Sequence, residues 1–125
     1  MKRNVSGDTL SFLDDGGKTT AELTEQKKED NVWLVRLKGS IGNDCAYDVA
    51  DELLAIASVG NGIILDMSDT TYVSNTFAEM LVQLQIRMER TEFESMPIQN
   101  MPQEIYRFLK ERGCITSLDY ELKEE

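Results

Sequence analysis

The sequence predicts an α/β fold in a single domain. Two short apolar runs, VWLVRL at 32–37 and GIILDM at 62–67, have the length and residue types of buried strands. Between and after these runs, apolar residues recur at spacings of three and four, as they do along one face of a helix. A chain of 125 residues with 41% hydrophobic content is long enough to bury one core and too short for two ordinary domains.

The first nineteen residues are predicted to be a flexible arm or an extra edge strand. They are polar and contain glycine, and the stretch GDTLSFLDDGGKTT offers only Leu10, Phe12 and Leu13 to a core. Residues 20–27 fit a short helix or an edge strand. The polar residues 29–31 that follow are typical of a turn into the strand at 32–37.

A helix is predicted from Asp44, with Asn43 or Asp44 as its N-cap and with Gly60 and Gly62 at its end. It lies between the strands at 32–37 and 62–67. The order strand, helix, strand predicts that these two strands are parallel neighbours joined by a right-handed crossover.

The second half of the chain continues this alternation. A second helix has the apolar stripe Phe77, Met80, Leu81, Leu84 and Met88. A weak strand signal surrounds Met96 and Ile98, and a third helix has Pro102 in its first turn and Gly113 just past its end. Alternation at 118–122 predicts a terminal strand, which an acidic tail at 123–125 follows.

The charge balance restricts the partners. With 23 acidic and 13 basic residues, the net charge of −10 repels phosphate backbones and anionic membrane surfaces, so we expect no nucleic-acid binding and no membrane insertion. The N-terminus lacks the apolar core of a signal peptide, and no apolar run is long enough to span a bilayer. We therefore expect a cytoplasmic protein.

The residue types also argue against metal or cofactor chemistry. The chain has no histidine, which removes the commonest general base and metal ligand. Cys45 and Cys114 lie far apart in the sequence without a metal-binding spacing, and we expect two buried thiols. We expect no metal site, no cofactor and no catalytic residue.

Polar residues cluster after each of the two apolar strands, in GSIGND at 39–44 and in SDTTYVSNT at 68–76. The carboxyl ends of parallel strands face one edge of a sheet, so we expect these two loops to meet there. The residues expected at this edge are Asn43, Asp44, Ser74, Asn75 and Thr76. A purely structural role is also open, because Thr76 and Glu79 fit a capping box and Asn75 is itself a favoured N-cap.

A family resemblance rests on VWLVRLKGSIG followed by a helix, on IILDMSDTTYVSNTFAEML, and on a third helix ending in GC. Through these segments, residues 20–122 resemble a STAS domain. This family includes bacterial anti-sigma-factor antagonists and the soluble domains of sulfate transporters. The resemblance implies a mixed β-sheet with helices packed against it. It also implies a bacterial, non-enzymatic protein, monomeric or weakly dimeric, that binds an anti-sigma factor or a serine/threonine kinase-like protein.

In the antagonist branch, partner choice is controlled by phosphorylation of a serine after the second loop. In this sequence that serine falls on Asn75, which has no hydroxyl, and the aspartate before it falls on Ser74. The family's first-loop aspartate falls on Gly42, beside Asn43 and Asp44. Three outcomes remain open: phosphorylation at Ser74 or Thr76, a binder fixed in one state by Asn75, or a role beside a transporter. The resemblance places Phe77 and Glu79 next to this edge, although Phe77 also fits the core stripe.

A different class of function rests on Asp66, which ends the run IILD. The segment IILDMSDT faintly resembles the nucleophilic motif of haloacid-dehalogenase-like phosphatases, and receiver domains also carry an aspartate at a strand end. The second acidic residue of the phosphatase motif falls on Ser68. We keep a small phosphoacceptor or phosphatase-like domain as the weaker alternative.

Overall fold

Seven strands in sequential order form a single sheet in the computed structural model, which describes residues 2–14, 16–90 and 95–124. The strands are β1 (Lys2–Ser6), β2 (Thr9–Leu13), β3 (Thr19–Lys27), β4 (Val32–Ile41), β5 (Gly62–Val73), β6 (Ile98–Met101) and β7 (Tyr120–Leu122). The helices are α1 (Ala46–Val59), α2 (Asn75–Glu89) and α3 (Gln103–Glu111), with the short 3₁₀ turns η1 (Glu29–Asn31) and η2 (Ile115–Ser117). No helix within the described residues is long and apolar enough to cross a membrane.

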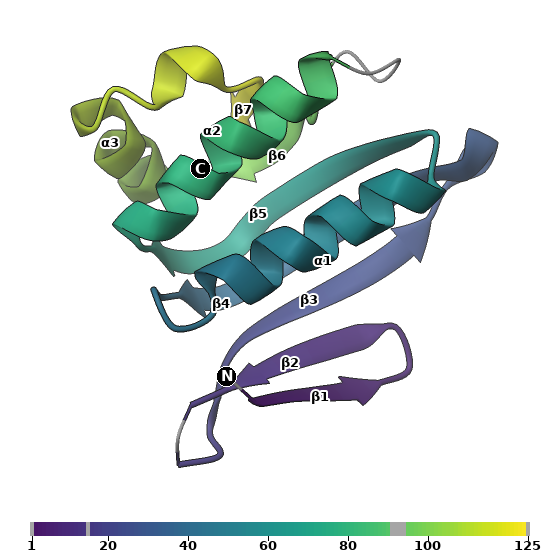
Figure 1. Cartoon of the computed structure of the whole chain (residues 1–125). Coiled ribbons are helices and arrows are strands. Elements are labelled where there is room, and N and C mark those ends of the chain that lie inside the picture. Colours follow the sequence, from purple (N-terminus) through teal and green to yellow (C-terminus); the bar gives the residue numbers. More distant parts are fainter. Residues whose placement is uncertain (1, 15, 91–94, 125) are drawn as a thin grey trace.

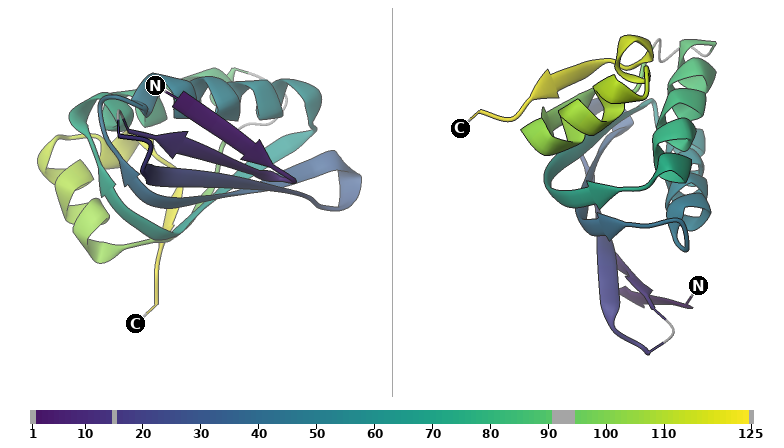
Figure 2. Two further views of the ribbon diagram at one scale, coloured as in Figure 1. Left: turned by 90° about the horizontal axis from the view of Figure 1, so that it is seen from below. Right: turned by 90° about the vertical axis from the view of Figure 1, so that its left-hand side faces the viewer.

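The sheet is mixed, as predicted. Strands β1 to β4 pair antiparallel, whereas β4 to β7 pair parallel. Parallel neighbours need a crossover connection, which α1, α2 and α3 provide in turn. Helices α1 and α2 lie next to each other against one face of the sheet, and α3 lies near β5 and η2 (Figures 1 and 2).

The N-terminal strands β1 and β2 form a hairpin that extends the sheet beyond β3. Leu10 and Phe12 of β2 are buried in the same core as the central strands. Residues 19–27 form a strand, because Ala21 and Leu23 alternate with more exposed residues and bury one face only.

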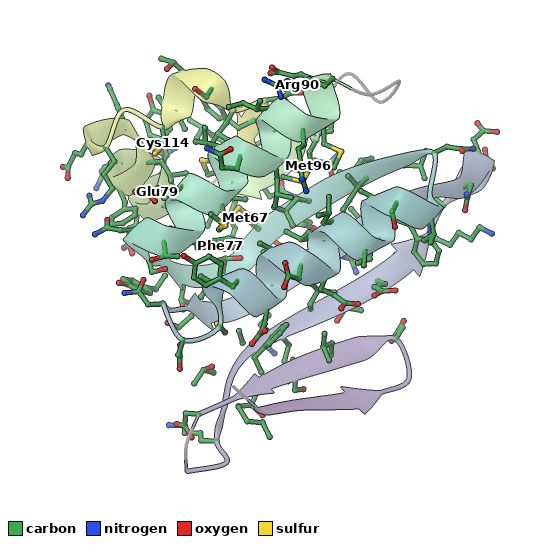
Figure 3. The ribbon with its side chains drawn as sticks, viewed as in Figure 1. Met67, Phe77, Glu79, Arg90, Met96 and Cys114 are labelled. Carbon is green, nitrogen blue, oxygen red and sulfur yellow. The ribbon has the colours of Figure 1, made fainter. Side chains whose placement is uncertain are left out.

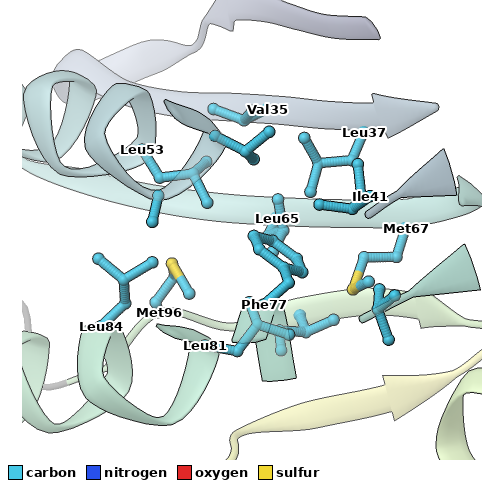
Figure 4. Packing of buried hydrophobic residues seen from close by; sticks show 14 of the residues in the cluster. Val35, Leu37, Ile41, Leu53, Leu65, Met67, Phe77, Leu81, Leu84 and Met96 are labelled. Carbon is cyan, nitrogen blue, oxygen red and sulfur yellow. The ribbon is translucent and has the colours of Figure 1, made fainter. Parts of the chain in front are cut away.

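The core lies between the sheet and the pair α1 and α2. Val35 and Leu37 of β4 point into it, while Arg36 and Lys38, which alternate with them, are exposed. Figure 4 shows Leu53 of α1 and Phe77, Leu81 and Leu84 of α2 packed around Leu65 and Met67 of β5. Cys45 is buried as expected, but Cys114 is only half-buried and neither cysteine forms a disulfide.

Strand β5 is longer than the apolar run predicted it to be. The segment 68–73, expected as loop, continues the strand to Val73, which pairs with Ile41 of a similarly extended β4. A register irregularity near Leu37 accommodates the extra length, and the Thr70 hydroxyl donates to the Leu37 carbonyl at 2.8 Å. Residues 68–73 were predicted as loop because several of their side chains are polar. Threonine, tyrosine and valine nevertheless all favour strands.

The helix termini agree only in part with the sequence. Helix α3 follows Pro102 directly, and Gly113 just beyond it has a φ of +70°, which favours glycine. The predicted start of α1 was wrong, because the helix begins at Ala46 with Cys45 at the cap position and without a side-chain cap. Asn43 and Asp44 instead lie in an exposed turn, which the Cys45 N–H closes by donating to the Gly42 carbonyl at 3.3 Å.

Candidate functional site

The ends of β4 and β5 meet at one edge of the sheet. The backbone N–H of Ser74 donates to the carbonyl of Ile41 at 2.9 Å, which brings the start of α2 beside the turn before α1. We call the turn 42–45 together with residues 74–76 the carboxyl edge. Within it, Asn43, Asp44 and Asn75 are exposed, and Thr76 is half-buried.

Ser74 is the N-cap of α2. Its Oγ accepts a hydrogen bond from the Phe77 N–H at 3.1 Å, and its carbonyl accepts from the Ala78 N–H at 2.9 Å. The capping box of Thr76 with Glu79 and the cap at Asn75 were therefore wrong, because β5 runs to Val73 and α2 starts immediately after Ser74. Ser74 is only 2% exposed, so its hydroxyl lies inside the protein.

Phe77 and Glu79 lie on opposite sides of the first turns of α2. The ring of Phe77 is fully buried between the start of α2 and α1, whereas Glu79 lies on the outer surface (Figure 3). Phe77 is therefore a core residue that supports the carboxyl edge from below, and it is not part of the exposed surface.

A contact from α3 reaches the carboxyl edge. The side-chain oxygen of Asn75 accepts a hydrogen bond from Nε of Arg112, whose guanidinium lies 3.8 Å from the ring centroid of Phe108. Arg112 follows α3 directly and is separated from Asn75 by 37 positions. Nothing local in the sequence indicates this contact, so sequence analysis missed Arg112.

Two exposed tyrosines also belong to this end of the molecule. Tyr47, in the first turn of α1, is 62% exposed, and Tyr72, near the end of β5, is 50% exposed. Tyr72 pairs with Ser40, one residue before the Ile41 carbonyl that Ser74 contacts. Exposed aromatic residues are typical of the centres of protein interfaces. Sequence analysis did not select them, because tyrosine is intermediate in burial and the sequence alone does not say whether a given one is exposed.

Asp66 lies inside β5 and anchors its neighbours. Its carboxylate accepts from the Ser68 N–H at 2.9 Å and from the Asn100 amide at 3.4 Å, and it pairs with Arg36 at 3.5 Å. Burial acts to raise the pKa of this carboxyl group, but the hydrogen bonds from Ser68 and Asn100 and the charge of Arg36 outweigh it and lower the pKa below 3.8. The strand continues for seven residues beyond Asp66, from Met67 to Val73, so Asp66 does not stand at a strand end.

The carboxyl edge offers hydrogen-bonding and aromatic groups rather than a metal-binding set. Across residues 2–14, 16–90 and 95–124, no three cysteine, aspartate or glutamate side chains are grouped so that they could hold a metal ion. The edge itself presents amide, hydroxyl and carboxylate groups, and Arg112, Tyr47 and Tyr72 add guanidinium and phenol groups beside it. Such a surface suits recognition of another protein.

Comparison with solved structures identifies the fold. An anti-sigma factor antagonist from Mycobacterium paratuberculosis superposes on this chain with a TM-score of 0.66 and 13% sequence identity. The match covers 81% of this chain and 85% of the other. The chain has the STAS fold.

The predicted STAS fold, a mixed sheet with helices packed against it, is thus confirmed. No family model matches the sequence, and no curated protein does. The STAS fold is therefore recognised here by its three-dimensional arrangement, at a sequence identity that carries information about the fold alone.

Proposed function

We propose that this chain is a non-catalytic protein-binding module of bacterial partner switching, similar to an anti-sigma-factor antagonist and working in the cytoplasm. Its partner is an anti-sigma factor or a serine/threonine kinase-like protein, bound at the carboxyl edge. The observation that carries the proposal is the fold shared with an anti-sigma factor antagonist over 81% of this chain. Residues 20–122 form the STAS unit of this proposal, preceded by the segment 1–19 and followed by the tail 123–125.

The surface assigned to the partner consists of Asn43, Asp44, Asn75 and Thr76, with Tyr47 and Tyr72 beside them and Glu79 at its margin. Ser74 and Phe77 hold this surface in place from inside the protein. Amide and carboxylate groups around exposed aromatic rings form the usual composition of a recognition surface.

If a kinase modifies this edge, we propose Thr76 as the acceptor. The Thr76 side chain is half-buried, whereas the Ser74 hydroxyl is buried and occupied as a helix cap. A phosphate on Ser74 would have to break this cap and enter the core, and a doubly charged group is costly to bury. Without modification at either residue, Asn75 fixes the module in one binding state.

The decisive experiment is capture of partners from the host lysate on the tagged protein, with mass spectrometry of both the partners and residues 74–76. A kinase-type anti-sigma factor supports the proposal, with phosphate on Thr76 indicating a switch and its absence indicating a fixed binder. Capture of transporter subunits would favour the alternative of a STAS scaffold without a switch, and capture of neither class would overturn the sigma-factor role.

Calorimetry with the captured partner then tests the location of the interface. Asn75→Asp is expected to weaken binding, because it adds a charge at the exposed start of α2. Gln83→Glu is the matched control, since it adds the same charge to an exposed position further along α2. Equal affinities of the wild type and Asn75→Asp would exclude this edge.

A further inference from the structure

The guanidinium group of Arg112 is held from two sides. The ring of Phe108 lies against it at 3.8 Å, and its Nε–H donates to the side-chain oxygen of Asn75. Arg112 is nevertheless exposed. An exposed arginine normally loses conformational entropy when it binds a partner, but this one is already oriented.

The hydrogen bond between Arg112 and Asn75 leaves hydrogen-bond donors of both side chains facing solvent. Arginine has no acceptor, so it must occupy the oxygen of the Asn75 amide and leave the amide nitrogen, with its two hydrogens, to other groups. Within the described part of the chain, neither the Asn75 amide nitrogen nor the two Nη groups of Arg112 has a hydrogen-bond partner. The pair therefore presents donors and one positive charge.

We propose that Arg112 and Asn75 together bind a carboxylate side chain, an aspartate or glutamate, of the protein partner. A carboxylate accepts from two donors at once, and charge-assisted bonds of this kind are about twice as strong as neutral ones. This carboxylate-binding role rests on the proposed function of the carboxyl edge, and it specifies which group of the partner binds there. It makes Arg112, rather than a residue of the two loops, the main determinant of affinity.

Charge complementarity supports the carboxylate. The chain carries a net charge of −10, and no aspartate or glutamate occupies the first turn of α2, which begins with Asn75. The net charge repels a carboxylate on average, and the guanidinium of Arg112 offsets this repulsion locally. The pair thus offers an acidic group of the partner an oriented positive charge with hydrogen-bond donors beside it.

The first test uses the full chain alone. Sodium acetate is the probe, and the NMR signals of the Arg112 Nε–H and the Asn75 side-chain amide are followed against sodium chloride at matched ionic strength. We expect saturable, acetate-specific shifts of both signals, and in Arg112→Gln a loss of the Asn75 shift. Identical responses to acetate and chloride would overturn the inference, whatever the partner is.

The second test uses the captured anti-sigma factor or kinase. Arg112→Gln is expected to raise the Kd at least tenfold, and Arg112→Lys to restore it only in part, because lysine lacks the planar fork. The control is Arg107→Gln, which removes an exposed arginine of α3 with less than a twofold change expected. Affinity of Arg112→Gln equal to the wild type would refute the inference. Absence of any such partner, together with acetate-specific shifts, would refute the proposed function and retain the carboxylate site.

Discussion

The Oγ atom of Ser74 accepts a hydrogen bond from the Phe77 N–H at 3.1 Å and so fixes the start of α2. This bond joins the last residue before the helix to the backbone of Phe77, whose side chain is fully buried in the first turn. It also makes Ser74 a structural residue in a segment whose hydroxyl groups invite a functional interpretation.

Ser74→Ala is therefore expected to destabilise the protein by about 1 to 2 kcal/mol, the usual cost of losing a helix N-cap. Thr76→Ala is the control and should cost clearly less, because Thr76 does not cap the helix. Urea unfolding of both variants measures the difference. A larger loss for Thr76→Ala would restore the capping box that the structure excludes.

Asp66→Asn is expected to destabilise the protein by about 1 to 3 kcal/mol at neutral pH, because it weakens a buried, hydrogen-bonded charge. The folded-state pKa of Asp66 lies below 3.8. The stabilisation by its ionised carboxylate is therefore complete above this pH and is lost as the pH falls through the folded-state pKa. The difference between variant and wild type should accordingly shrink in acid.

Urea unfolding at a series of pH values tests the Asp66 prediction. The control is Asp69→Asn on the same strand, whose side chain is exposed, with an expected change below about 0.5 kcal/mol. A difference between wild type and Asp66→Asn that does not vary with pH would show that the pKa of Asp66 is the same in the folded and unfolded states, against the lowered folded-state pKa.

Glu25→Gln is expected to raise the unfolding temperature at pH 7 slightly. Burial, followed by the charge and hydrogen bond of Glu52 and the charge of Asp8, raises the pKa of Glu25 above 4.5. The folded protein thus binds this proton more tightly than the unfolded chain, so the resulting stabilisation is present below pH 4.5 and is lost as the pH rises through the folded-state pKa.

Calorimetric melting at pH 7 and pH 4 checks this prediction, and the gain of Glu25→Gln should shrink at the lower pH. Glu22→Gln serves as the control because Glu22 pairs across strands with the cationic Lys38. An equal gain from both substitutions would point to the net charge of the chain rather than to the Glu25 carboxyl group.

Gly39→Ala is expected to destabilise the protein by more than about 1 kcal/mol. Gly39 has a φ of +93°, and an added Cβ would lie 2.5 Å from the Thr20 carbonyl oxygen on β3. Gly62→Ala should be tolerated, since its Cβ would only touch the Val32 side chain at 3.6 Å. Thermal melting that ranks the two variants in the opposite order would contradict the close approach of β3 and β4.

The sequence by itself determined the alternation of elements. The apolar runs at 32–37 and 62–67 and the helical stripe from Phe77 to Met88 are local patterns, and each element formed where its pattern lies. The parallel pairing of β4 with β5 also followed from the order of elements. The order of elements predicted the α/β class, because each element buries one face against a neighbouring layer. The STAS fold was predicted from the resemblance of residues 20–122 to that family.

Only the tertiary structure decided the details of the carboxyl edge. Strand β5 extends to Val73 because Ile41 of β4 offers it a partner, and this extension moved the helix cap to Ser74. The contact of Arg112 with Asn75 joins residues 37 positions apart, and the exposure of Tyr47 and Tyr72 depends on what covers them. Periodicity and capping preferences act over a few residues, whereas these features depend on segments that meet only after the chain has folded.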